Sequence, residues 1–242
     1  MTFITRSSKT VPSVTTEQMR RVDRIAIEET GPSLLQMMEN AGRNLALSAM
    51  ELMLNNWQQA TYLFLAGKGG NGGGAICAAR HLSNRGLNVL LYLAHDSGLS
   101  AAVKRQLQIF KATKGKLVNQ RDLNRLKPQI IIDGLIGYSL RGKPEAKTAR
   151  IIDWANQQSA VKLALDIPSG IDASDGTSSG VFFKADVTLT LALPKCGLMN
   201  ENCGRLILAD IGIPEECFKL AGMDFSPRIW GKQYRIEIFR QK

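Results

Sequence analysis

Two aspartates each come directly after an apolar run of strand length. Asp133 follows Ile130–Ile132, and Asp166 follows Leu163–Leu165. Because ligands of open α/β sheets bind beyond the carboxyl ends of the strands, both carboxylates are candidates for one site at that edge. Ser169 follows shortly after Asp166 and adds a hydroxyl. A single aspartate in such a place is most often a turn cap, but the repeated pattern favours a functional site.

A glycine-rich segment, Gly67–Gly74, lies between an expected strand, Tyr62–Ala66, and an expected helix, Ala75–Arg85. Such a turn presents free N–H groups and a partial positive charge to an anion, so we expect a phosphate-bearing ligand; a flexible turn without a ligand is the alternative. No Lys-Ser or Lys-Thr pair follows the glycines, which disfavours a Walker A loop. No acidic residue ends the Val89–Ala94 strand to hold a ribose, so hydride transfer is not the first choice.

If the sheet order brings the strand ends together, Asp133, Asp166, Ser169 and Asn71 form a cluster of oxygen donors. Hard oxygen ligands with one or two carboxylates suit a monovalent cation better than zinc or copper. A carboxylate that is not a ligand is then a candidate general acid or base beside a bound nucleotide.

Other polar residues carry weaker signals. Arg141 and Lys195 are candidates to contact an anionic ligand, and a solvated surface side chain is the alternative for each. Cys196 has no base nearby in the sequence, which disfavours a nucleophilic role. The two histidines, His81 and His95, have no evident nucleophile partner, so a Ser/His/Asp triad is disfavoured.

Alternating strand and helix patterns must position these residues. The near-continuous apolar segments read as buried strands are Tyr62–Ala66, Val89–Ala94, Gln129–Asp133, Lys162–Asp166 and Val187–Leu193, with shorter ones at Arg205–Ala209 and Tyr234–Phe239. The amphipathic segments read as helices are Thr15–Thr30, Ser33–Asn56, Ala75–Arg85, Ala101–Thr113 and Ala146–Gln157. This order predicts an α/β fold: a Rossmann-like three-layer sandwich with a mostly parallel central sheet and an N-terminal helical extension.

One domain over residues 1–242 is the simplest organisation. Residues 1–14 form an arm whose order the sequence leaves open, and 15–57 form the N-terminal helices. Residues 60–213 form the Rossmann-like core, and 214–242 form a C-terminal extension.

Composition limits the functional classes. The chain has 242 residues, 44% of them hydrophobic, and 31 Lys and Arg against 21 Asp and Glu give a net charge of +10. This excess favours anionic partners such as nucleotides, nucleic acid or an acidic membrane surface. The four cysteines form no CxxC pair, which disfavours structural zinc or a disulfide framework and suits a reducing compartment. No membrane span or signal segment is visible, so we expect an intracellular, cytoplasmic protein, with an organelle left open.

Five sequence blocks together resemble the NAD(P)H-hydrate epimerase family, also known as the YjeF N-terminal domain family. The resemblance runs from about Thr16 to Pro214. The blocks are MENAGRNLA at Met38–Ala46, GKGGNGGGAICAARHL at Gly67–Leu82, IIDGLIGYSLRG at Ile131–Gly142, ALDIPSGIDASDG at Ala164–Gly176 and ADVTLTLALPKCGL at Ala185–Leu198.

The resemblance implies a Rossmann-like homodimer that interconverts the R and S epimers of hydrated NADH or NADPH, a metabolite-repair isomerase. A separate dehydratase would restore the S form to the normal cofactor. The family's potassium site falls on Asn71, Asp133 and Ser169. Its substrate-contacting positions fall on Gly70, Asn71, Gly72, Gly73, Gly74, Gly137, Tyr138, Ser139, Leu140, Arg141, Gly142, Lys143 and Asp166. Asp166 is the candidate acid or base near C6 of the damaged ring, and loss and re-addition of water is the working mechanism.

The sequence also departs from the family's pattern. The family's loop reads G-x-G-N-N-G-G-D-G, whereas here Gly70 replaces the first Asn, Gly74 the Asp and Ala75 the last Gly. These changes and the basic charge favour an alternative, a catalytically impaired nucleotide- or RNA-binding scaffold on the same fold. The presence of Asp133, Asp166 and Ser169 favours the enzyme.

Overall fold

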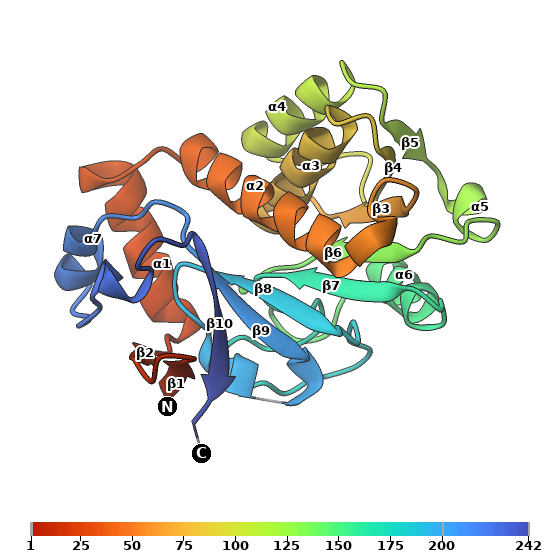
Figure 1. Ribbon diagram of the computed structural model, residues 1–242. Coiled ribbons are helices and arrows are strands. Elements are labelled where there is room, and N and C mark those ends of the chain that lie inside the picture. The colour runs from red at the N-terminus through yellow and green to blue at the C-terminus, as the bar shows by residue number, and fades with distance from the viewer. Residues whose placement is uncertain (1, 200, 242) are drawn as a thin grey trace.

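The computed structural model describes residues 2–199 and 201–241 (Figure 1). These residues form a ten-stranded sheet in the order β2-β1-β10-β9-β8-β7-β6-β3-β4-β5. The parallel part consists of β3 (Thr61–Ala66), β4 (Asn88–Leu93), β5 (Lys116–Val118), β6 (Ile130–Gly134), β7 (Val161–Leu165), β8 (Val187–Leu191) and β9 (Arg205–Ala209). The antiparallel edge consists of β10 (Arg235–Arg240), β1 (Thr2–Thr5) and β2 (Thr10–Pro12).

Helices cover both faces of the parallel strands. The described helices are α1 (Thr16–Ile25), α2 (Leu34–Leu52), α3 (Gly70–Ser83), α4 (Ala101–Phe110), α5 (Gln120–Leu123), α6 (Ala146–Asn156) and α7 (Glu215–Leu220). Figure 1 shows α2, α3 and α4 together above the sheet, and α1 beside α7 near its antiparallel edge. In β3, Tyr62 and Phe64 pack toward α2, α3 and α4, whereas Leu63 and Leu65 pack on the other face with residues of α6. Successive side chains of β3 thus pack against helices on opposite faces of the sheet, which gives the expected three layers of helix, sheet and helix.

The N-terminal helices begin at side-chain caps. The Thr15 hydroxyl accepts a hydrogen bond from the Gln18 amide at the start of α1, and Gln18 bonds back to the Thr15 amide. Ser33 and Gln36 form the same reciprocal pair at the start of α2. Each pair satisfies two amides that the first helical turn leaves without partners. These caps therefore fix where α1 and α2 begin.

The glycine-rich segment is not the turn that the sequence predicted. Helix α3 begins at Gly70, not at Ala75, so most of the glycines lie in its first turns. A Cβ on Gly72 would lie 1.9 Å from the Gly67 carbonyl oxygen, and one on Gly73 would lie 2.5 Å from the Met38 Cε. Close packing, and not a need for unusual backbone angles, therefore explains these glycines.

The chain ends are also more ordered than their sequence suggests. Strands β1 and β2 lie within the arm whose order was left open, and β1 pairs with β10. The strand predicted at Tyr234–Phe239 is confirmed, shifted by one residue. The short elements β5, α5 and α7 were not predicted. Strands β10, β1 and β2 thus extend the sheet beyond β9, and β5 forms its opposite edge.

Candidate functional site

Asp133 and Ser169 form a buried pair at the carboxyl edge of the sheet. Asp133 lies near the end of β6, and Ser169 lies in the turn after β7. The Ser169 hydroxyl donates to Asp133 Oδ1 at 2.7 Å, and its amide donates to Oδ2 at 2.8 Å. The Leu135 amide adds a third bond to Oδ1 at 3.0 Å. Three donors therefore fix the carboxyl group in one orientation.

Asn71 joins this pair from the first turn of α3. Its Nδ2 donates to the carbonyl oxygens of Leu165 at 2.7 Å and Ile136 at 3.2 Å. The Ser169 hydroxyl lies 3.1 Å from the same Ile136 oxygen. Because both amide hydrogens of Asn71 are used, its Oδ1 remains as an acceptor. The structure thus brings Asn71 and Ser169 to one carbonyl group, and Ser169 connects that group to Asp133.

The Asp133 carboxyl group has no basic partner among the described residues. Burial raises its pKa to about 6, although the hydrogen bonds from Ser169 and Leu135 act to lower the pKa. Asp133 is 1% exposed, and burying a carboxylate without a paired cation costs free energy of folding. A small cation held by these oxygens would compensate that charge.

Asp166 forms a second, separate arrangement with Lys195. The Lys195 ammonium forms an ion pair with Asp166 Oδ1 and donates to the Leu191 carbonyl at 3.0 Å. The Leu191 amide donates to Asp166 Oδ1 at 3.2 Å. Asp166 has a φ of +69°, in the left-handed region that side chains rarely adopt. Such strain persists where surrounding contacts impose it, which is common at functional sites.

Lys195 is therefore neither a solvated side chain nor a free contact for an anionic ligand. It is 1% exposed and its charge is already paired. The sequence drew attention to Lys195 but could not indicate this partner, because Asp166 lies 29 residues away in the chain.

A cavity of about 130 Å³ adjoins the Asp166–Lys195 pair. Its mostly apolar wall comes from α1, α2 and the strand ends, and its lining includes Met19, Met38, Leu165, Leu191 and Ile211. Pockets for drug-sized ligands measure roughly 300–1,000 Å³, so this cavity suits a single ring with the rest of a larger ligand outside.

The predicted substrate-contacting segments contribute unequally to the cavity. Gly70, Asn71 and Gly74 line it, whereas Gly72 and Gly73 are packed inside the protein. In the loop 137–143, Tyr138 lines the cavity; Ser139, Leu140, Arg141, Gly142 and Lys143 do not. Arg141 is exposed.

The close packing at Gly72 leads to a prediction about the stability of the fold. Gly72→Ala is expected to destabilise the protein by about 3 kcal/mol, because its Cβ would collide with the backbone of Gly67. Gly70→Ala is the matched control, since no atom lies within 4 Å of its Cβ position. Urea denaturation of both variants measures the difference, and equal stabilities would contradict the packing argument.

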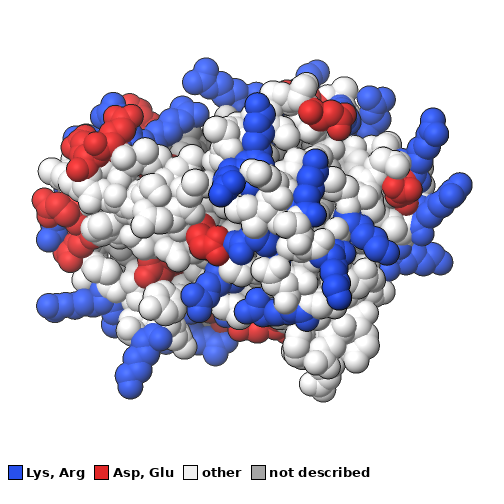
Figure 2. Space-filling model, turned by 90° about the horizontal axis from the view of Figure 1, so that it is seen from above, with Lys and Arg blue, Asp and Glu red and all other residues white. Residues whose placement is uncertain are grey.

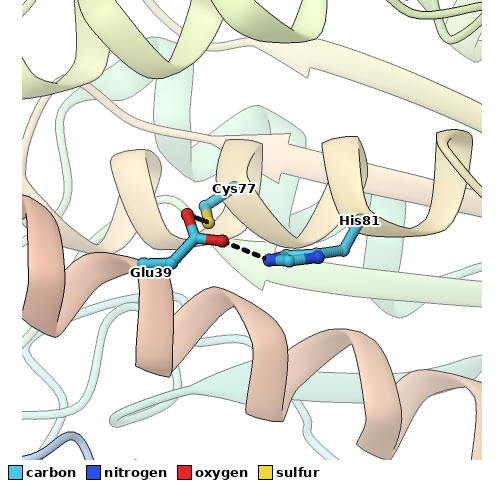
Figure 3. A group of neighbouring side chains, drawn as sticks. All are labelled: Glu39, Cys77 and His81. Carbon is cyan, nitrogen blue, oxygen red and sulfur yellow. Dashed lines mark hydrogen bonds and ion pairs between the residues drawn. The ribbon is translucent and has the colours of Figure 1, made fainter.

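A cluster of Glu39, Cys77 and His81 lies between α2 and α3 (Figure 3). Its potential ligand atoms lie within 4.8 Å of one another, but the Arg80 guanidinium occupies the position of a cation. Arg80 Nη2 lies 2.5 Å from Glu39 Oε2 and 3.3 Å from both Cys77 Sγ and His81 Nε2. Burial raises the pKa of the Cys77 thiol to about 12. The cluster therefore joins two helices and is not a metal site of this structure.

Basic side chains are spread over the face that carries α2, α3 and α4. Figure 2 shows Lys and Arg across this face, with fewer Asp and Glu among them. No helix in the described part of the chain combines the length and apolarity needed to cross a membrane.

A mostly parallel sheet covered on both faces, with a mostly apolar cavity that also holds the Asp166–Lys195 pair at the ends of its central strands, defines a Rossmann-like α/β protein of the ligand-binding class. The chain belongs to the family described as YjeF-related protein N-terminus, which matches residues 34–197. This confirms the family resemblance and the predicted fold class.

Related proteins carry names that refer to NAD(P)H hydrate. A protein of Dehalogenimonas lykanthroporepellens named NAD(P)H-hydrate epimerase is 42% identical over 241 residues, covering 99% of this chain and 98% of the relative. The bifunctional NAD(P)H-hydrate repair enzyme Nnr of Moorella thermoacetica is 32% identical, covering 84% of this chain but 41% of that longer protein. The crystal structure of the yeast protein YNL200c has a TM-score of 0.82 at 20% identity, covering 94% of this chain and 100% of that one. The yeast structure supports the fold alone.

Proposed function

We propose that this protein is an NAD(P)H-hydrate epimerase acting in metabolite repair. The observation that carries the proposal is the Asp166–Lys195 pair at the wall of a ring-sized cavity. The epimerase that is 42% identical over nearly the whole chain supports the same activity.

The cavity chemistry fits a hydrated nicotinamide ring. In that ring C6 carries a hydroxyl group next to the ring nitrogen N1. Loss of the hydroxyl as water, with the N1 lone pair forming a double bond to C6, makes the centre planar. Water added to the opposite face then gives the other epimer. In the proposed mechanism Asp166 exchanges a proton with the leaving or entering water; its place in the cavity lining and its contacts with Lys195 and Leu191 support this role.

The decisive experiment is conversion of purified R-form hydrated NADH by this protein in isotopically labelled water. Conversion above the spontaneous rate supports the epimerase, and incorporation of the isotope into the hydroxyl group on C6 supports the water-exchange route. Binding of an adenine nucleotide without conversion would support the alternative scaffold. Binding of RNA with a steep salt dependence would indicate that the positive charge serves phosphate backbones.

A potassium ion is the cation that the Asn71, Asp133 and Ser169 cluster is proposed to hold. All the atoms of the cluster that are available as cation ligands are oxygens. The buried Asp133 charge has no other compensating cation among the described residues. When bound, the ion would supply charge compensation and order the two strand-end turns.

Potassium is expected to stabilise the wild-type protein against unfolding more than tetramethylammonium does. At ten times the dissociation constant the gain is about 1.4 kcal/mol. Thermal denaturation in the two chloride salts measures it without any need for activity. Asp133→Asn is expected to remove the difference, and identical wild-type midpoints in both salts would refute the site.

Two partner assignments accompany the proposed function. A dehydratase acting on the S form belongs to the same repair sequence, as the bifunctional relatives suggest. A homodimer is the proposed assembly, and light scattering of the purified protein tests it.

A further inference from the structure

A second carboxyl group, that of Asp23, lines the same cavity as Asp166. Asp23 comes from α1, whereas Asp166 comes from the turn after β7. The two carboxyl groups thus enter the cavity from different structural elements. Asp23 also lies outside the segment 34–197 that matches the family.

A continuous set of contacts links the two carboxyl groups. The Tyr138 hydroxyl donates to Asp23 Oδ2. Lys195 Nζ lies 5.7 Å from the centre of the Tyr138 ring and forms the ion pair with Asp166. The bond from Tyr138 fixes the orientation of Asp23 and occupies one of its oxygens. Its Oδ1 is then the oxygen able to carry a proton to a ligand.

The surroundings of the two carboxyl groups suit different roles. Burial raises the pKa of Asp23 and is the largest influence on it. The Tyr138 hydrogen bond and the Lys195 charge lower that pKa, and the Asp166 charge raises it. The Arg20 charge acts on Tyr138. Asp166 instead has a cation in direct contact. Paired carboxyl groups in contrasting surroundings are a common basis for separate acid and base functions.

We propose that Asp23 is a second catalytic residue, the general acid that acts together with Asp166 in the same cavity. This inference rests on the proposed epimerase function. Asp23 donates its proton to the C6 hydroxyl, the C6–O bond breaks with its electron pair going to oxygen, and water leaves. The N1 lone pair forms the N1=C6 bond. A water molecule then adds to the opposite face and gives its proton to Asp166, while the N1=C6 pair returns to N1. The reverse epimerisation uses the same groups with exchanged roles.

The test compares Asp23→Asn with Glu28→Gln, a control that alters an exposed carboxyl group in the helical turn following α1. Asp23→Asn is expected to lower kcat by at least about 100-fold with little change in KM, whereas the control retains wild-type kinetics. Because the acid must be protonated, wild-type kcat is expected to fall as pH rises through the pKa of Asp23. Asp23→Asn should lose this alkaline limb.

Tyr138→Phe supplies a second variant that keeps the carboxyl group and the ring. It is expected to fold and to retain more activity than Asp23→Asn. The pH at which its kcat falls on the alkaline side should differ from that of the wild type. An active wild type with Asp23→Asn within about threefold of its kcat, or with its loss confined to KM, overturns the inference alone. An inactive wild type overturns the proposed function and this inference with it.

Discussion

Asp166→Asn is expected to lower the kcat of epimerisation by about 100-fold to 10,000-fold, the range typical of a lost general acid or base. The replacement keeps the size and the planar shape of the side chain. It also suits the backbone, because asparagine tolerates a positive φ better than most residues and position 166 has a φ of +69°. Conversion of R-form hydrated NADH measures the effect.

The matched control is Asp153→Asn, which alters an exposed carboxyl group on α6. It is expected to leave kcat unchanged. If Asp166→Asn epimerised the substrate at the wild-type rate, Asp166 would have no acid or base role and the proposed mechanism would be wrong.

Lys195→Met is expected to destabilise the fold by about 3–5 kcal/mol, because it leaves the buried Asp166 carboxylate without its cation. Methionine fills much of the space of the lysine stem, so the lost charge dominates the effect. The free energy of unfolding from urea titration measures the loss.

The double variant Asp166→Asn, Lys195→Met separates charge from packing. Because it removes both charges, it is expected to recover much of the stability lost by Lys195→Met alone. Additive losses in the double-mutant cycle would show that the ion pair contributes no coupling, which contradicts the role assigned to it.

The sequence predicted that Asn71, Asp133, Asp166 and Ser169 form one cluster; the structure brings Asn71, Asp133 and Ser169 together, whereas Asp166 pairs with Lys195. Asp133, Asp166 and Ser169 each follow a strong apolar run, and parallel strands bring such positions to one edge. The predicted start of α3 was wrong, because glycine is a poor helix former and a glycine-rich segment therefore indicates a turn. Only the three-dimensional packing against Gly67 and Met38 explains why glycines occur inside that helix.

The roles of Asp23 and Lys195 could not be predicted, because both depend on contacts between distant segments. One signal for Asp23 was present: it lies four residues after Met19 and next to Val22, on the apolar side of α1. A carboxyl group in that position needs a polar partner, but the sequence does not name Tyr138. Lys195 likewise pairs across two strand ends whose spacing is known only after folding.

The pairing of β1 with β10 has a consequence for synthesis on the ribosome. Phe3 pairs with Arg240, and Figure 1 shows both chain ends at the same side of the molecule. The hairpin of β1 and β2 comes early in the described chain, whereas its partner strand β10 is made much later. Until then Phe3 and Val11 lack their packing with Ile236 and Ile238 of the same core cluster, and an unpaired strand edge is open to association with other chains. This sheet edge can therefore be completed only after β10 has been synthesised, and a nascent chain that stalls before β10 is a candidate for chaperone binding.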